Sequence, residues 1–127
     1  MSASVLLDTP ILIWMRADPE RLNRTERSAI ERAVARFVSA ASLWELTQLM
    51  AGYQLANDLR FFDVPAGFTL LPIAPRHCQE LLHLPSSLSD PFDRMLVAQA
   101  RRDNLVLLSR DDAVRKLVDS VVTDVAY

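Results

Sequence analysis

Short apolar runs alternate with segments of helical periodicity along this chain, and this alternation limits the folds that it can adopt. Runs rich in β-forming residues lie at positions 4–7, 36–39, 68–73 and 105–108, and each is followed by a helical pattern. A further run spans 121–125. Parallel strands joined by helices produce this alternation, because each connection must return to the same end of the sheet. The sequence therefore predicts an α/β fold with a short, mostly parallel sheet flanked by helices.

Start signals mark several of the helical segments. Pro10, Pro75 and Pro91 lie in or just before a first turn, where the missing N–H of proline leaves no hydrogen bond unmade. Asp18-Pro19 marks a turn. We expect helices over 11–15, 25–35, 42–50, 57–62, 76–84, 90–102 and 111–117.

One domain covering 1–127 is expected, because the length suits a single core and half of the residues are apolar. Cys78 is the only cysteine, so it has no partner for an internal disulfide, and we expect it to be a buried small residue. Asp8 and Pro10 interrupt the first apolar stretch well short of a bilayer span. We therefore expect a cytoplasmic protein without a signal peptide or membrane helix.

Acidic residues follow the ends of the predicted strands. Asp8 ends the first strand, and Asp111 lies just past the run at 105–108. Glu45 and Asp93 lie in the predicted first turns of two helices. Ligands of open parallel sheets bind at the carboxyl ends of the strands. If these strands are parallel neighbours, four carboxylates from distant parts of the chain meet at one edge.

Helix capping offers a competing explanation for each acid. Ser42 and Glu45 have the spacing of a capping box, and Asp90 suits the N-cap of the helix that it opens. Asp111 or Asp112 can cap the last helix, and the first acid can simply begin a turn. Capping does not require acids at the same edge each time, however, and clustered carboxylates repel one another unless a cation joins them. The joint pattern therefore favours a metal site.

Oxygen ligands are preferred by Mg²⁺ and Mn²⁺, and such ions lower the pKa of a bound water and offset charge on a leaving oxygen. Phosphoryl transfer is the expected chemistry. The hydroxyls of Thr9 and Ser109, beside two of the acids, can hold a carboxylate or a metal-bound water in place. His77 and His83 fall away from this edge, so we expect them to be core or surface residues.

The formal net charge of −2 argues against a protein that binds nucleic acid merely by being basic. The basic pairs at 101–102 and 115–116 are candidates for phosphate contact, although cations also suit the ends of helices. Trp14 and Trp44 lie beside proposed ligands. Core or dimer packing is favoured over base stacking for both, because their neighbours are apolar.

Five segments carry a family pattern: LLDTPILIWM (6–15), VSAASLWEL (38–46), LLPIAPRH (70–77), SDPFDRMLVAQA (89–100) and LVLLSRDDAV (105–114). Taken in order, they resemble the PIN-domain nucleases, and specifically the VapC-like toxins of bacterial toxin–antitoxin pairs. They span nearly the whole chain, and the combination of LLDT, SLWE and the DPFDR run is the specific part. The resemblance implies a three-layer PIN-like fold.

The resemblance also implies an endoribonuclease that uses Mg²⁺ or Mn²⁺, acts on RNA as a homodimer and is inhibited by a cognate antitoxin. Carried across by position, the family's catalytic and metal-binding acids are Asp8, Glu45, Asp93 and Asp111. Asp8 and Asp93 resemble the most direct metal ligands. Asp90 matches a recurrent acid of the subgroup but also suits the N-cap, which we favour. Arg94 is expected in a surface salt bridge, with phosphate contact as the alternative.

Two other functions stay open at this point. One is a PIN fold used only as a binding or scaffold module, although the intact set of acids argues against it. The other is a receiver-like phosphoacceptor domain, but Lys116, the only lysine, is wrongly placed for it. The stretch 54–68 departs from the Lys/Gly-rich pattern of the family, so the RNA target is not predicted.

Overall fold

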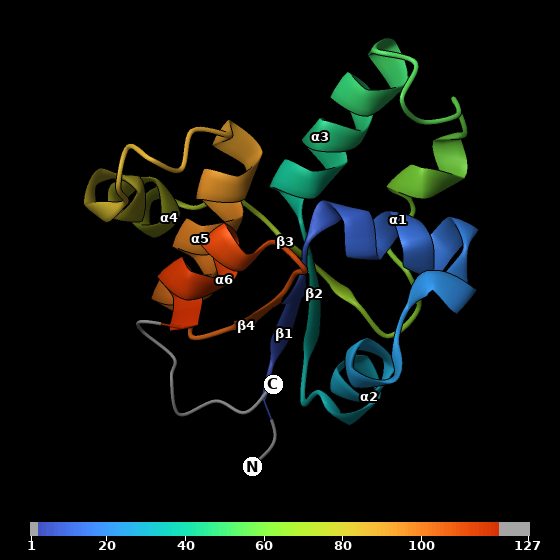
Figure 1. Ribbon diagram of the computed structural model, residues 1–127, viewed down its shortest axis with the longest axis horizontal. Helices are drawn as coiled ribbons and strands as arrows, with labels where there is room; N and C mark the ends of the chain where they lie inside the picture. The colour runs from blue at the N-terminus through green and yellow to red at the C-terminus, as the bar shows by residue number, and fades with distance from the viewer. Residues whose placement is uncertain (1–2, 120–127) are drawn as a thin grey trace.

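A parallel sheet forms the centre of the protein in the computed structural model, which describes residues 3–119 (Figure 1). Its strands are β1 (Val5–Leu7), β2 (Arg36–Ser39), β3 (Thr69–Leu71) and β4 (Val106–Leu108), in the order β3-β2-β1-β4. All three pairings are parallel, and Leu6 lies level with Phe37 on one side and Leu107 on the other. The predicted parallel α/β fold is confirmed. The strand expected at 121–125 lies outside the described residues.

Helices cover both faces of this sheet. Within residues 3–119 they are α1 (Thr9–Ala17), α2 (Arg24–Arg32), α3 (Ala40–Ala51), α4 (Pro75–Glu80), α5 (Pro91–Asp103) and α6 (Asp112–Asp119), with 3-10 turns η1 (Pro19–Arg21), η2 (Leu59–Phe62) and η3 (Leu81–His83). In Figure 1, α4, α5 and α6 lie on one side of the strands, and α1 and α2 lie on the other. The sheet is therefore the middle one of three layers. None of the described helices is long and apolar enough to cross a membrane.

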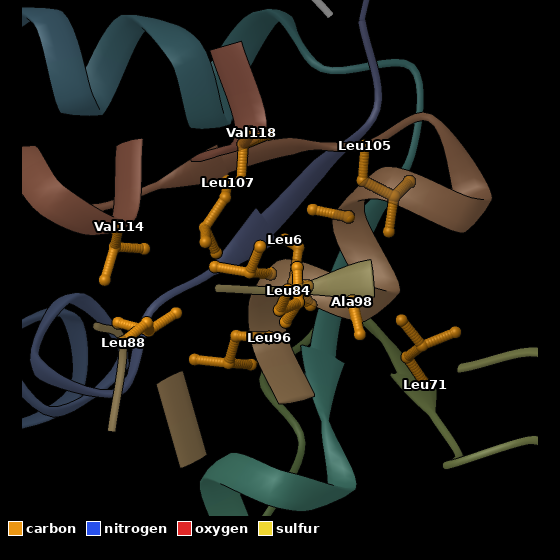
Figure 2. Close-up of a cluster of buried hydrophobic side chains, with 12 residues drawn as sticks. Leu6, Leu71, Leu84, Leu88, Leu96, Ala98, Leu105, Leu107, Val114 and Val118 are labelled. Atoms are coloured by element: carbon orange, nitrogen blue, oxygen red, sulfur yellow. The ribbon is translucent and has the colours of Figure 1, made fainter. Parts of the chain in front are cut away.

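Successive residues of the short strands are buried in two different apolar clusters. Leu6 and Leu107 belong to the cluster that includes α5 and α6, and Figure 2 shows Leu6 close to Leu96 of α5. Leu7 and Leu108 belong to the second cluster, with residues of α1 and α3. Adjacent side chains of a strand point to opposite faces, so a strand covered on both faces is an unbroken apolar run. This explains why β1 and β4 consist of apolar residues alone.

Helix α3 begins two residues earlier than predicted. Ser39, at the end of β2, caps it, because its hydroxyl accepts a hydrogen bond of 2.9 Å from the N–H of Ala41. Ser42 therefore lies within the first turn and contacts the hydroxyl of Thr9 at 2.9 Å. The capping box predicted for Ser42 and Glu45 is wrong, and Glu45 lies in the second turn.

A second difference lies at the end of α2, which stops at Arg32 where the prediction extended to 35. The Arg36 guanidinium donates to the carbonyl oxygens of Ile30 and Glu31, which closes the turn into β2. Asn104, after α5, has a φ of 53°, the left-handed conformation that asparagine tolerates. The sharp turn from α5 into β4 therefore needs no glycine.

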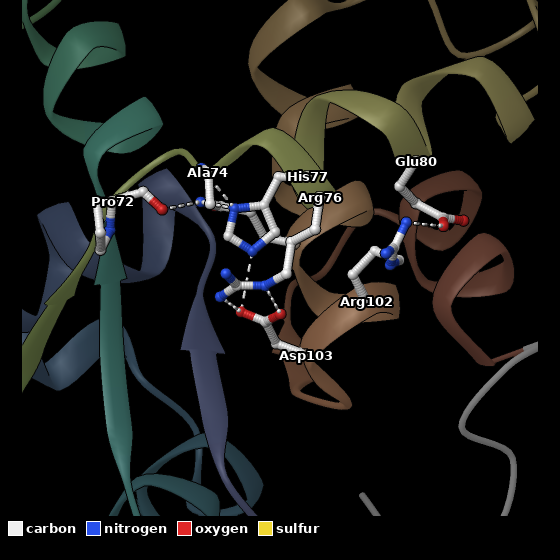
Figure 3. Close-up of polar contacts among 8 residues, drawn as sticks. Pro72, Ala74, Arg76, His77, Glu80, Arg102 and Asp103 are labelled. Atoms are coloured by element: carbon white, nitrogen blue, oxygen red, sulfur yellow. Dashed lines mark hydrogen bonds and ion pairs between the residues drawn. The ribbon is translucent and has the colours of Figure 1, made fainter.

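A buried polar network joins α4 to α5 (Figure 3). Nδ1 of His77 accepts from the N–H of Ala74 at 3.0 Å, so Nε2 donates to Asp103 at 2.9 Å. Arg76 also binds Asp103, at 2.7 and 3.0 Å, and holds the pKa of that carboxyl below its usual range, with His77 as a smaller cause. His77 is thus a core residue, as expected. Cys78 is exposed, which corrects the prediction, because the next position of a helix is turned by about 100°.

Candidate active site

The carboxyl end of the sheet opens into a pocket of about 230 Å³ that is rich in carboxylates. Its lining residues are Asp8, Pro10, Ile11, Trp14, Glu45, Asp90, Asp93, Arg110 and Asp111. All four acids that the sequence placed at this edge line the same pocket, together with Asp90. They come from four separate segments of the chain, so the parallel topology is what brings them together.

Asp8 lies directly after β1, and it is almost fully buried. One carboxylate oxygen accepts from the N–H of Thr9 at 2.8 Å, and the other accepts from the hydroxyl of Ser109 at 2.7 Å. Burial is the largest influence and raises the pKa of Asp8, although these two hydrogen bonds oppose it. The Ser109 hydroxyl therefore holds a carboxylate in place, which is one of the two contacts expected for it.

Glu45 faces the pocket from the second turn of α3, and its side chain is half-buried. Burial raises the pKa of Glu45, and the nearby charges of Asp90 and Asp8 raise it further. A hydrogen bond with Thr9 acts in the opposite direction. The Thr9 hydroxyl also donates to Ser42 and thus links α1 to α3.

Asp93, in the first turn of α5, is the most perturbed acid of the pocket. Burial and then the carboxylates of Asp90, Asp8, Glu45 and Asp111, in that order, raise its pKa to about 7. Within residues 3–119 its carboxylate has no hydrogen-bond or ion-pair partner. A half-buried carboxylate surrounded by like charge and lacking a partner is the group that a cation would stabilise most.

Asp90 is the N-cap of α5, as favoured from the sequence. One of its oxygens accepts from the N–H groups of Phe92 and Asp93, at 2.9 and 3.0 Å. Its charge is nevertheless the second-largest cause, after burial, of the raised pKa of Asp93. Asp90 therefore caps a helix and adds negative charge to the pocket at the same time.

Asp111 precedes α6 and has a similar capping role. One oxygen accepts from the N–H groups of Ala113 and Val114, at 2.9 and 3.3 Å, and its own N–H donates to the Ser109 hydroxyl at 3.1 Å. Asp112 is exposed, lies 3.8 Å from Arg115 and does not line the pocket. Of these two neighbouring acids, only Asp111 lies at the site.

Arg94 does not form the surface salt bridge that we expected. Its guanidinium donates to three backbone carbonyl oxygens, those of Leu81, Pro85 and Leu88, at 2.7 to 3.1 Å. These contacts hold the loop before α5 against the helix. Arg94 is therefore a structural residue of that loop and contacts no carboxylate of residues 3–119.

The pocket offers the oxygen donors that a hard divalent cation prefers, and its acids raise one another's pKa values as unneutralised carboxylates do. This chemistry fits Mg²⁺ or Mn²⁺. Among residues 3–119, however, no three His, Cys, Asp or Glu side chains are arranged so that they could hold a metal ion as they stand. The acids therefore line one pocket without forming a closed ligand set.

Sequence reasoning missed Arg110, which is the one cationic residue of the acidic pocket within the part of the chain that the structure describes. Its partners are far away in the sequence: it binds Glu26 at 2.7 Å and lies 4.3 Å from the centre of the Trp14 ring. Trp14 is half-buried there, with Arg21 also over its ring at 4.6 Å. No local pattern identifies such a pair. The only available signal was the position of Arg110, one residue before a proposed acid.

Trp44 is exposed, with 57% of its surface accessible, so of the two packing roles predicted for it core packing is excluded and dimer packing stays a prediction. Its ring meets that of Phe92 edge to face, with 5.0 Å between ring centres and an interplanar angle of 80°. This aromatic pair joins α3 to the start of α5, beside Glu45 and Asp93. It therefore holds together the two helices that carry these acids.

Comparison with known proteins places this geometry in a family. The model of the PIN domain family matches residues 5–119. A protein from Mycobacterium tuberculosis, Ribonuclease VapC22, is 32% identical over 117 residues, which cover 88% of this chain and 90% of that protein. A solved toxin–antitoxin complex from Klebsiella pneumoniae is similar in fold, with a TM-score of 0.56 and 20% identity over 84% of this chain and 86% of that one.

Proposed function

Because this chain belongs to the PIN-domain family, we propose that it is a metal-dependent endoribonuclease and the toxin of a toxin–antitoxin pair. The observation that supports this most is the pocket in which four carboxylates surround a fifth, Asp93, whose pKa is about 7 and whose side chain has no partner within residues 3–119. A pocket of this kind suits hydrolysis of a phosphodiester bond better than binding alone. The ribonuclease name of the relative supports RNA as the substrate.

The proposed ligands of Mg²⁺ or Mn²⁺ are Asp8 and Asp93, with Glu45 and Asp111 completing the set. A bound ion would supply a Lewis acid and a water of lowered pKa for attack on phosphorus. Ser109 and the N–H of Thr9 would keep the Asp8 carboxylate oriented towards the pocket. Burial of Asp8 excludes water from its surroundings and so strengthens the interaction of its charge with a cation.

Substitution of the proposed ligands tests this function. Asp8→Asn and Asp93→Asn keep the shape of each side chain but remove its charge, so we expect each to slow Mn²⁺-dependent cleavage of a labelled RNA at least about 100-fold. Toxicity on expression in a bacterium should disappear with both. Asp58→Asn is the matched control, because Asp58 is an acid that pairs with Arg60 on η2 and does not line the pocket. Unchanged cleavage by both ligand variants, or equal cleavage by the parent protein in EDTA, would contradict the proposal.

The proposed partners follow from the same family. We propose that a cognate antitoxin covers the acidic pocket and that the substrate is RNA. We also propose that the protein acts in the cytoplasm, where it would encounter both. We also propose a homodimer, for which light scattering should give twice the chain mass of 14.3 kDa. A monomer mass at micromolar concentration would contradict the proposed homodimer but would not affect the proposed chemistry.

A further inference from the structure

We infer that Arg110 is a positioning residue that binds a backbone phosphate of the RNA strand beside the carboxylate pocket. The inference rests on the proposed ribonuclease function. Arg110 lies between Ser109, which holds Asp8, and Asp111, which caps α6. Among the residues of 3–119 that line the acidic pocket it is the only cation, and five carboxylates line the same pocket.

The Arg110 side chain is held in one orientation by contacts to distant segments. Nε and Nη2 donate to the two carboxylate oxygens of Glu26, at 2.7 Å each, and Nη2 also donates to the carbonyl oxygen of Arg21 at 2.6 Å. The guanidinium carbon lies 4.3 Å from the centre of the Trp14 ring. A guanidinium fixed in this way loses little freedom when it binds a ligand, which favours recognition of a phosphate.

These contacts use Nε and Nη2 of Arg110 and leave Nη1 available. The five N–H donors of the guanidinium include two on Nη1, and Nη1 has no hydrogen-bond partner within residues 3–119. The side chain is 42% exposed. A purely structural role, in which Arg110 neutralises the buried Glu26, accounts for Nε and Nη2 but leaves Nη1 unused at the rim of the pocket.

Charge supplies the reason for a cation at this position. A phosphate next to the scissile bond would approach several carboxylates, and the repulsion must be offset if RNA is to enter. Three of the basic residues proposed from sequence for phosphate contact have acidic neighbours: Arg101 and Arg102 lie 3.2 and 3.9 Å from Glu80, and Arg115 lies 3.8 Å from Asp112. Arg110 also lines a larger pocket of about 780 Å³ between α2 and β4. It therefore lies between this pocket and the acidic one. It can thus contact a strand that runs past the pocket.

The test compares two variants that break the same ion pair. Arg110→Gln removes the cation, whereas Glu26→Gln removes its partner, keeps Arg110 charged and preserves the capping of α2, since glutamine also serves in a capping box. Both should lower the thermal midpoint to a similar extent. Arg110→Gln should weaken RNA binding the most, because Glu26→Gln loosens the guanidinium but leaves its charge in place. Arg60→Gln, which breaks the exposed pair with Asp58, is the control for loss of a surface arginine.

Binding is measured in the Asp93→Asn background by the fluorescence anisotropy of a labelled 20-nucleotide single-stranded RNA at a series of KCl concentrations. We expect Arg110→Gln to raise Kd about five- to tenfold at 50 mM KCl. The slope of log Kd against log[KCl] should fall by about 0.7, the value for one lost phosphate contact on a single strand. Glu26→Gln and Arg60→Gln should retain the parent slope.

Equal Kd and equal slope for Arg110→Gln and Glu26→Gln would overturn the inference and leave Arg110 a structural residue. If Arg110→Gln does not fold, Arg110→Lys replaces it. Lysine keeps the charge but has no fork to share between Glu26 and a phosphate, so Kd should rise at least about threefold, and an unchanged Kd would overturn the inference. Cleavage by the parent protein with Mn²⁺ separates the two claims. If the parent cleaves RNA, only the Arg110 contact has failed, and if it neither binds nor cleaves RNA, both have failed.

Discussion

Asp93 combines partial burial, the absence of a partner within the described residues and a pKa raised to about 7. Each of these properties costs free energy when the side chain is ionised, because neighbouring carboxylates repel it and burial removes part of its hydration. The folded protein therefore retains a group that destabilises it at neutral pH when no cation is bound. Such a cost is typical of residues that serve a ligand rather than the fold.

Asp93→Asn should accordingly stabilise the metal-free protein, and the gain should depend on pH. The folded-state pKa of Asp93 lies above its unfolded value of 3.8, so its contribution to stability is present below about pH 4 and is lost as the pH rises through 7. Allowing for half exposure, we expect Asp93→Asn to gain about 1 kcal/mol at pH 8, or roughly 4 °C, and much less at pH 5.

Thermal unfolding in EDTA at the two pH values measures this difference. Glu45 and Asp8 have raised pKa values as well, so the parent protein should itself become less stable between pH 5 and 8 in the absence of metal. If the thermal midpoint of Asp93→Asn at pH 8 is equal to or below that of the parent, the charge of Asp93 does not destabilise the folded protein.

At the scale of the elements, the helices α1, α5 and α6 each have an aspartate next to their first residue, and all three aspartates line one pocket. Asp8, Asp90 and Asp111 each use one carboxylate oxygen to accept a backbone N–H of the following helix. Within residues 3–119 the second oxygen of Asp90 and of Asp111 accepts no hydrogen bond. Capping thus leaves one oxygen of Asp90 and of Asp111 without a hydrogen bond, so for these two acids the capping explanation is compatible with the proposed cation site.

Two substitutions of Asp90 separate its cap from its charge. Asparagine caps helices as well as aspartate does, so Asp90→Asn should keep the thermal midpoint, whereas Asp90→Ala should lose about 1 kcal/mol. If Asp90 only caps the helix, Asp90→Asn should retain cleavage to within about threefold. Loss of cleavage by Asp90→Asn as complete as that of Asp93→Asn would make Asp90 a metal ligand instead.

Sequence periodicity predicted the elements because β1 and β4 are buried on both faces and the helices bury one face, which sets the apolar pattern directly. It also predicted the shared edge, since parallel topology carries strand ends to one side. It could not choose between Ser39 and Ser42 as the cap of α3, because both are serines near the same helix start. The contacts of Arg94 and Arg110 were equally out of reach, since their partners are set by tertiary packing.

At the scale of the whole molecule, the two apolar clusters lie on opposite faces of the same strands, and both include residues of β1 and β4. Leu6 and Leu7 are neighbours in β1, both have no exposed surface, and they face opposite clusters. Neither cluster can lose its packing without disturbing the strand that the other also needs. One cooperative unit is the expected consequence, in keeping with the single domain predicted for 1–127.

Leu6→Ala and Leu7→Ala test this coupling. Each should cost about 2–5 kcal/mol in the free energy of unfolding, the usual range for a large side chain removed from a core. Circular dichroism and tryptophan fluorescence should follow one transition in both variants, since the two indole rings lie on α1 and α3. Two separated transitions in either variant would show that the layers unfold independently.

Calorimetric titration of Mn²⁺ into the purified protein tests whether the carboxylate pocket binds a cation. We expect saturable binding at neutral pH with release of protons, because Asp93 is partly protonated near its pKa of about 7 and must ionise to bind a cation. Binding should weaken at least about tenfold in Asp8→Asn and Asp93→Asn and stay unchanged in Asp58→Asn. Absence of Mn²⁺ binding, both to the free protein and in the presence of an oligoribonucleotide, would contradict the account and favour a PIN fold that serves only as a binding module.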